Sequence, residues 1–260
     1  MAYARIWHRL TRDEAASLPG PTVALAALGA VEQHGPHLPL ETDTLLAEAV
    51  ARRAIARATG PVVILPTLSI GVSPEHQGFG GTISLSPATL ADQIAALAAT
   101  VARAGLSRLM LVNGHGGNIA VLDQAALDAR RRHGLAVAKA HLGRLGVPAG
   151  YLPAPVVAAD LHGGAIETAV MLALAPHRVG PVPGDGAGLG ARFDPTAALT
   201  PEGPIAFAWT AEDLSEDGVI GAPDLATAEI GRAILDHWVH QVAAGLDALA
   251  AGAVPPASGV

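Results

Sequence analysis

Five titratable side chains fall within residues 31–44 (VEQHGPHLPLETDT): Glu32, His34, His37, Glu41 and Asp43. Because charged residues make up only 15% of the chain, this local concentration of titratable groups indicates a functional site. Carboxylates and imidazoles are ligands of zinc, manganese and iron. Glu32 and His34 are two residues apart, so an extended backbone directs both to one side, and Asp43 can return to them after a turn. The stretch predicts a divalent-metal site; the alternative is a polar loop that caps the next helix through Thr42 or Asp43.

A second candidate ligand lies in the turn NGHGGN at residues 113–118, where glycines surround His115. Glycine permits backbone conformations that bring the chain close to a ligand, so His115 can complete the coordination begun by the first stretch. Gly116 and Gly117 are candidate substrate-binding residues through their backbone N–H groups. The alternative is a capped turn with an incidental histidine. The turn lacks the lysine and the spacing of a phosphate loop.

A third cluster, DLHGGAIET at residues 160–168, contains His162 and Glu167. His162 suits general acid–base catalysis because an imidazole titrates near neutral pH. Glu167 is a candidate for two roles, as a metal ligand and as a catalytic residue that orients a bound ligand. The alternative for Glu167 is an acidic residue favoured by the dipole at a helix N-terminus.

A glycine-rich segment, GVSPEHQGFGGTISL at residues 71–85, contains Ser73, Glu75 and His76. It is longer than an ordinary connection, and long loops often carry function. We expect its three polar side chains to bind the substrate, in a loop that lines a pocket or reaches a neighbouring subunit. The alternative is a solvated connection.

Apolar runs and helical periodicity predict alternating strands and helices. The expected strands are residues 23–28, 62–65, 108–112 and 135–140, and the expected helices are residues 7–18, 44–58, 88–104, 119–132, 165–175 and 225–249. This alternation predicts an α/β fold with a parallel sheet and right-handed crossovers. In such sheets ligands bind beyond the carboxyl ends of the strands, and each polar cluster follows a predicted strand. Six isolated histidines are expected to be surface or structural: His8, His133, His141, His177, His237 and His240.

The composition limits the possible partners. A chain of 260 residues fits one α/β domain, which we expect over residues 1–251, followed by a flexible tail at 252–260. The net charge of −7 and the lack of a basic stripe argue against a nucleic-acid partner. The sequence contains no uninterrupted apolar run of about 18 residues, so we expect no membrane span. The chain has no cysteine, so we expect any metal to be bound by histidine and carboxylate ligands. No long apolar segment follows basic residues near the N-terminus, so we expect no signal peptide and a cytoplasmic location.

The segments EQHGPHLPLETD, EHQGFGGTISL, NGHGGN and HGGAIET, in this order and spacing, resemble the creatininase (creatinine amidohydrolase) family. A weaker match at residues 215–231 resembles the family's C-terminal segment, and together the matches cover most of residues 23–235. The resemblance implies a three-layer α/β sandwich with a mainly parallel central sheet flanked by helices. It also implies two divalent metal ions per chain (Zn, Mn or Fe) and a homo-oligomer, commonly a hexamer. Family members hydrolyse C–N bonds of cyclic amides, formamides or peptides.

The resemblance assigns roles to individual residues. By position, Glu32 and His115 would hold one metal ion, His34 would hold the other, and Asp43 would bridge the two. His162 matches the family's proposed proton-transferring histidine.

The chain also departs from creatininase itself. A tyrosine and a glutamate of creatininase are replaced by Gly116 and Gly117, and that glutamate is a ligand of the second metal ion. The second site would then depend on Glu167 or on water. The tryptophan and glutamate that hold creatinine are matched by Ala158 and Leu161, which argues against creatinine as the substrate. The glycine-rich loop is closer to the deformylase and mycofactocin-maturation peptidase branches.

The sequence therefore predicts a metal-dependent amidohydrolase in which a metal-activated water attacks an amide or formamide carbonyl. His162 would pass a proton to the leaving nitrogen. The expected substrate is a small molecule or a short peptide. Two alternatives remain: a lactone or sugar-ring hydrolase that uses the same site, and a non-catalytic small-molecule-binding homologue.

Overall fold

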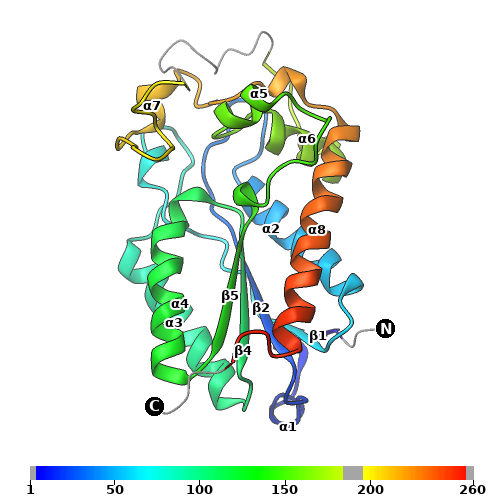
Figure 1. Cartoon of the computed structure of the whole chain (residues 1–260). Helices are drawn as coiled ribbons and strands as arrows, with labels where there is room; N and C mark the ends of the chain where they lie inside the picture. Colours follow the sequence, from blue (N-terminus) through cyan, green and yellow to red (C-terminus); the bar gives the residue numbers. More distant parts are fainter. Residues whose placement is uncertain (1–3, 184–195, 256–260) are drawn as a thin grey trace.

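A five-stranded parallel sheet forms the centre of the computed structural model, which describes residues 4–183 and 196–255 (Figure 1). The strand order is β1-β3-β2-β4-β5, and every pair of neighbours is parallel. The strands are β1 (Ala4–Ile6), β2 (Val23–Leu28), β3 (Val62–Ile64), β4 (Arg108–Asn113) and β5 (Ala136–His141). All carboxyl ends therefore meet at one edge of the sheet, as expected.

Helices cover both faces of the sheet. They are α1 (Arg12–Ala16), α2 (Thr42–Arg57), α3 (Pro87–Arg103), α4 (Ile119–His133), α5 (Ala154–Ala159), α6 (Ala165–Leu174), α7 (Ala211–Leu214) and α8 (Ala228–Ala250). Within the described residues, 3-10 turns are formed by Trp7–Arg9, Pro74–His76, Gly116–Asn118, Leu142–Arg144, Pro176–Arg178 and Pro223–Leu225. In Figure 1, α3 and α4 lie on one side of the sheet and α2 and α8 on the other. The three-layer α/β sandwich is confirmed.

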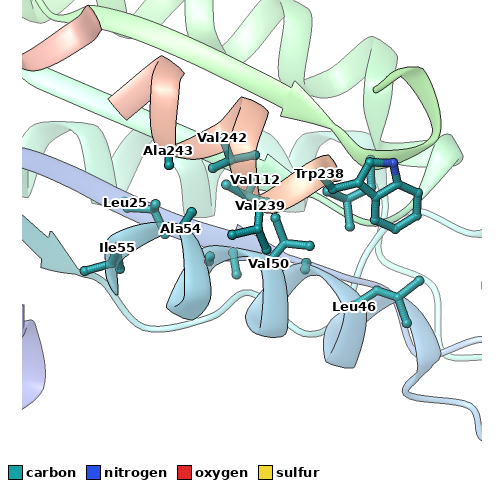
Figure 2. Close-up of a cluster of buried hydrophobic side chains, with 14 of the residues drawn as sticks. Leu25, Leu46, Val50, Ala54, Ile55, Val112, Trp238, Val239, Val242 and Ala243 are labelled. Atoms are coloured by element: carbon teal, nitrogen blue, oxygen red, sulfur yellow. The ribbon is translucent and has the colours of Figure 1, made fainter. Parts of the chain in front are cut away.

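The central strand β2 packs against both helical layers. Its residues Val23 and Leu25 join the core formed with α2, α6 and α8, whereas Ala24 and Leu28 join the core formed with α3 and α4. Successive side chains of a strand point to opposite faces, so a strand covered on both faces reads as an unbroken apolar run. Figure 2 shows the first of these cores, where side chains of α2 and α8 meet Leu25.

The structure also differs from the sequence-based expectation. The helix expected at residues 7–18 is broken into a 3-10 turn and the short α1, because Thr11 and Glu14 form a capping box that starts the helix there. The strand β1 was not predicted, and neither were α5 and α7. The N-cap of α2 is Glu41, without a side-chain hydrogen bond, so neither Thr42 nor Asp43 caps that helix.

The helices of the described ranges are each too short or too polar to span a membrane. Part of the expected tail, residues 256–260, lies outside the described residues.

Candidate metal centre and active site

The three polar clusters meet at the carboxyl edge of the sheet. Strands β2 and β4 pair with Leu28 opposite Asn113, and the N–H of Gly114 donates to the Leu28 carbonyl at 2.8 Å. Gly114 then packs directly on the first turn of α2. A Cβ on Gly114 would lie 2.4 Å from the Asp43 carbonyl oxygen, so only glycine permits this approach. The close contact places His115 beside Asp43.

His115, Glu32 and Asp43 form the first group of candidate ligands, and all three are buried. His115 Nδ1 lies 3.1 Å from Glu32 Oε1 and 3.5 Å from Asp43 Oδ2. On the other side of the ring, Nε2 lies 2.8 Å from the Val72 carbonyl oxygen. A carbonyl only accepts hydrogen bonds, so Nε2 carries a proton, and Nδ1 is the ring nitrogen that faces the two carboxylates and is available to a cation. A backbone partner that fixes the tautomer in this way is typical of a metal-ligating histidine.

His34 and Glu167 form the second group together with the other oxygen of Asp43. His34 Nε2 lies 3.2 Å from Asp43 Oδ1 and 3.8 Å from Glu167 Oε2. Its Nδ1 donates to the Glu32 carbonyl oxygen at 3.1 Å, so Nε2 is the nitrogen free to bind an ion. The two oxygens of Asp43 therefore face two different imidazoles, which is the arrangement that a bridging carboxylate requires.

The donor set fits divalent cations. Among the described residues, neither carboxylate oxygen of Glu32 nor Oδ2 of Asp43 accepts a hydrogen bond, although all three atoms are buried. Buried carboxylate oxygens without a partner cost several kcal/mol unless a cation compensates them, by order of magnitude. Burial alone would lower the pKa of His34 and of His115, but the neighbouring carboxylates outweigh it and raise both pKa values to about 10. The carboxylates therefore hold positive charge at both imidazoles, as protons or as metal ions.

His162 lies over both groups. Its ring is 4.2 Å from the ring of His34 and stacks on the ring of His76 at 4.0 Å, measured between centroids. Nε2 lies 2.5 Å from the Gln33 carbonyl oxygen, so Nε2 carries the proton and Nδ1 is the basic atom, 3.7 Å from Glu32 Oε1. Burial and the neighbouring imidazoles of His34 and His76 hold the pKa of His162 well below its ordinary value. The ring is therefore neutral in this environment.

His76 differs from His34 and His115 because of its contact with Gln33. The Gln33 side chain is fixed by two contacts: Oε1 accepts from the Gly35 N–H at 2.9 Å, and Nε2 donates to the Gly218 carbonyl at 3.1 Å. The same amide nitrogen lies 2.9 Å from His76 Nδ1, which must accept. His76 therefore carries its proton on Nε2, 3.6 Å from Glu32 Oε1, and faces the centre as a donor. The role of Gln33 was missed by the sequence analysis.

Glu75 takes up the space beside Gly117. A Cβ on Gly117 would lie 2.5 Å from Glu75 Oε1, 2.5 Å from His115 Nε2 and 2.3 Å from the Val72 carbonyl oxygen. Glu75 Oε1 is 3.5 Å from His115 Nε2. The glycine-rich loop thus places the Glu75 carboxylate beside His115, in the space that Gly117 leaves open because it has no side chain.

The remaining candidates divide into two sets. Glu75, His76, Gly116 and Gly117 line a cavity of about 930 Å³ that also contains Glu32, Asp43, His115, His162 and Glu167. Ser73, which we expected to bind the substrate, is fully buried, and its hydroxyl lies 3.2 Å from His115 Nε2. Ser73 is not among the residues that line the cavity, so its position suits orientation of His115.

Two members of the first titratable stretch lie apart from the centre. His37 Nε2 is 2.8 Å from the Thr168 hydroxyl, and Glu41 pairs with Arg178 at the surface. Both contacts fix the chain around α6 and neither side chain lines the cavity.

His141 was expected to be surface or structural, but it lies in the cavity wall and is only 9% exposed. Arg144, Asp123 and Trp209 line the same cavity and were also missed. A signal was available for His141, because it directly follows the predicted strand 135–140 at the edge where ligands bind.

The creatininase family model, described as creatinine amidohydrolase, matches residues 8–246 of the chain. The chain belongs to the creatininase family. Among its creatininase-family relatives is the mycofactocin precursor peptide peptidase of Mycolicibacterium smegmatis, with 36% identity over 228 residues, 84% of this chain and 81% of the relative. The creatinine amidohydrolase of Pseudomonas putida is 34% identical over 182 residues, 64% of this chain and 69% of the relative. The greater similarity to the peptidases than to creatininase itself is confirmed.

Solved structures of creatininases share the fold. A mutant creatininase superposes with a TM-score of 0.77 at 25% identity, covering 97% of this chain and 100% of that chain. A structure described as the manganese form of creatininase gives a TM-score of 0.73 at 26% identity, covering 94% and 97%. The curated relatives are hydrolases, which supports a hydrolase activity for this creatininase-family chain.

Proposed function

We propose that this chain is a metal-dependent amidohydrolase that cleaves a C–N bond of a short peptide or a small amide. The observation that carries the proposal is the position of Asp43, whose two buried oxygens face His34 and His115 separately. An arrangement of this kind suits two divalent ions that share one carboxylate. The unpartnered oxygens of Glu32 support the same reading.

Glu32, Asp43 and His115 would hold one ion, and Asp43, His34 and Glu167 would hold the other. A divalent ion acts as a Lewis acid and lowers the pKa of water, so that a nucleophile is available near neutral pH. The backbone carbonyls of Val72 and Glu32 accept from His115 Nε2 and His34 Nδ1, so the opposite ring nitrogens are the ones that an ion would bind after displacing a proton.

We assign the transfer of protons during hydrolysis to His162. Its Nε2–H is engaged by the Gln33 carbonyl, so proton exchange takes place at Nδ1. Nδ1 can accept a proton from the attacking water and deliver it to the leaving nitrogen. His76 presents an N–H to the same side of the centre and is a donor for a substrate oxygen.

The similarity to peptidases and the cavity volume of about 930 Å³ favour a short peptide over a small ring. Leu161, which replaces a polar residue of creatininase, also lines the cavity and leaves creatinine without that partner. Glu167 and Glu75 supply carboxylates that the turn at Gly117 lacks, which argues against a decayed, non-catalytic site.

Metal analysis and hydrolysis assays test this function together. We expect about two tightly held ions per chain, and hydrolysis of amides or peptides that chelation abolishes and metal restores. His115→Ala should lose metal, whereas the matched control His133→Ala, at the exposed end of α4, should retain it. Equal hydrolysis rates with and without chelator would refute the proposal. Faster cleavage of lactones than of amides in the same panel would favour the alternative hydrolase.

A further inference from the structure

The cavity has a second polar wall, beside the metal centre, that the proposed chemistry does not use. His141 is the last residue of β5 and pairs in register with Asn113 at the end of β4. Neighbouring strands are about 4.8 Å apart, so this wall lies one strand further along the sheet than the His115 turn. Arg144 ends the 3-10 turn Leu142–Arg144 that follows β5, and both side chains line the cavity.

Contacts of Asn113 fix the proton of His141. The Asn113 amide donates from Nδ2 to the His115 carbonyl at 2.6 Å, while its Oδ1 accepts from Asn118 Nδ2 at 3.0 Å. The amide nitrogen therefore also faces His141 Nδ1, 3.2 Å away, which must accept. A neutral His141 then carries its proton on Nε2. This buried atom finds no hydrogen-bond partner within the described part of the chain, an arrangement that costs free energy unless a ligand supplies an acceptor.

The charges around His141 favour an anion. Burial and then the positive charge of Arg144 lower the pKa of His141, so the ring is neutral and donates one N–H. Asp123, the carboxylate of this wall, is paired with Lys139. In the ranges that the structure describes, no acidic side chain forms an ion pair with Arg144. Within the described ranges, the wall therefore combines a guanidinium outside any ion pair with a buried N–H donor of His141 that lacks a partner.

We propose that His141 and Arg144 form a subsite for a carboxylate group of the substrate. A guanidinium offers a planar fork of N–H donors that matches a carboxylate, and the Nε2–H of His141 supplies a further donor. The inference rests on the proposed function and narrows it to amides that carry a carboxylate within a residue or two of the cleaved bond. Peptides with a free C-terminus are the substrates of this kind that we would test.

The test compares N-acetyl dipeptides that end in a free carboxylate with the same dipeptides as C-terminal carboxamides. Binding to the metal-loaded protein is measured by calorimetry, and hydrolysis is measured separately. We expect the carboxylate form to bind about tenfold more tightly, and Arg144→Gln to remove this preference without changing the bound metal or the affinity for the carboxamide. Arg132→Gln, an exposed arginine of α4, is the matched control and should keep the preference.

A preference that survives Arg144→Gln would overturn the inference, because the carboxylate would then be bound by the metal ions. Equal affinity for the two forms, or no binding of either, would overturn it as well. His141→Phe, which removes the N–H donor, should weaken binding of the carboxylate form alone. A panel that shows no amide hydrolysis, while binding still prefers the carboxylate form in an Arg144-dependent way, would support the carboxylate subsite and refute the proposed hydrolase activity.

Discussion

Replacing Gly117 with alanine tests the packing of the metal centre. A Cβ at Gly117 would lie 2.3 Å from the Val72 carbonyl oxygen and 2.5 Å from Glu75 Oε1 and from His115 Nε2. The carbonyl is a backbone atom and already accepts the hydrogen bond that orients His115. Rotation of a flexible side chain therefore cannot relieve the contact, and the Val72 carbonyl must separate from the turn.

The size of the effect follows from these distances. Carbon and oxygen atoms rarely approach closer than about 3.3 Å, so the two segments must move apart by about 1 Å. Overpacking of this kind costs about 1–3 kcal/mol of unfolding free energy. Disturbing the hydrogen bond that orients a ligating histidine typically lowers metal affinity about 10–100-fold. We expect Gly117→Ala to show both losses.

Gly116→Ala is the matched control, since no atom lies within 4 Å of a Cβ at that position. Neither glycine adopts a positive φ, so backbone strain does not separate the two substitutions. Urea unfolding of the metal-free proteins gives the stability difference, and competition with a chelator gives the metal affinity. Equal urea midpoints for the two variants, or metal binding by Gly117→Ala as tight as that of the unmodified chain, would contradict this packing at Gly117.

Other perturbations address the rest of the structure. In the proposed two-ion centre Glu167 would hold the ion beside His34, so Glu167→Gln should reduce the metal content from about two ions per chain to about one; unchanged content in elemental analysis would exclude Glu167 as a ligand. Chelation should lower the urea midpoint, because ions that bind only the folded state stabilise it; a constant midpoint would contradict ligands buried in the fold. Asp247→Ala should cost about 1 kcal/mol near neutral pH, since the carboxylate accepts two backbone N–H groups in the turn after α2. Although burial raises the pKa of Asp247, those hydrogen bonds hold it below its ordinary value, so the stabilisation is present above that value and is lost as the pH falls through the folded-state pKa. The urea midpoints of Asp247→Ala and the unmodified chain should therefore approach each other in acid, and a constant gap would refute the assignment.

Much of the fold could be predicted because its central strands are buried on both faces. The run Val23–Leu28 was predicted with its observed bounds, and the other three expected strands agree to within a residue or two. The edge strand Ala4–Ile6 could not be recognised, since three residues carry no periodicity and its extended form depends on pairing with β3. Thr11 shows the opposite case, in which a local capping box set a helix boundary that periodicity alone had placed too early.

The site was predictable only where its residues are clustered in sequence. Glu32, His34 and Asp43 lie close together in the chain, and the parallel sheet brought His115 to them, as expected. Gln33 could not be assigned because its orientation depends on Gly218, 185 residues away. His141 lies outside the polar clusters of the sequence, and its tautomer is set by Asn113 of the adjacent strand. The roles of these residues depend on tertiary contacts that cannot be inferred from residue spacing in the sequence.

The charge of the centre bears on how many ions it holds. Four carboxylates approach the clustered imidazoles: Glu32, Asp43, Glu75 and Glu167. Two divalent ions would balance four ionised carboxylates, whereas with fewer ions protons on His34, His115 or Glu167 would have to balance the remaining charge. In the proposed centre, Glu75 and Glu167, which come from different segments, would supply the carboxylate that Gly117 cannot provide. The change at Gly117 is therefore compatible with a complete two-ion centre whose charge comes from other segments of the chain.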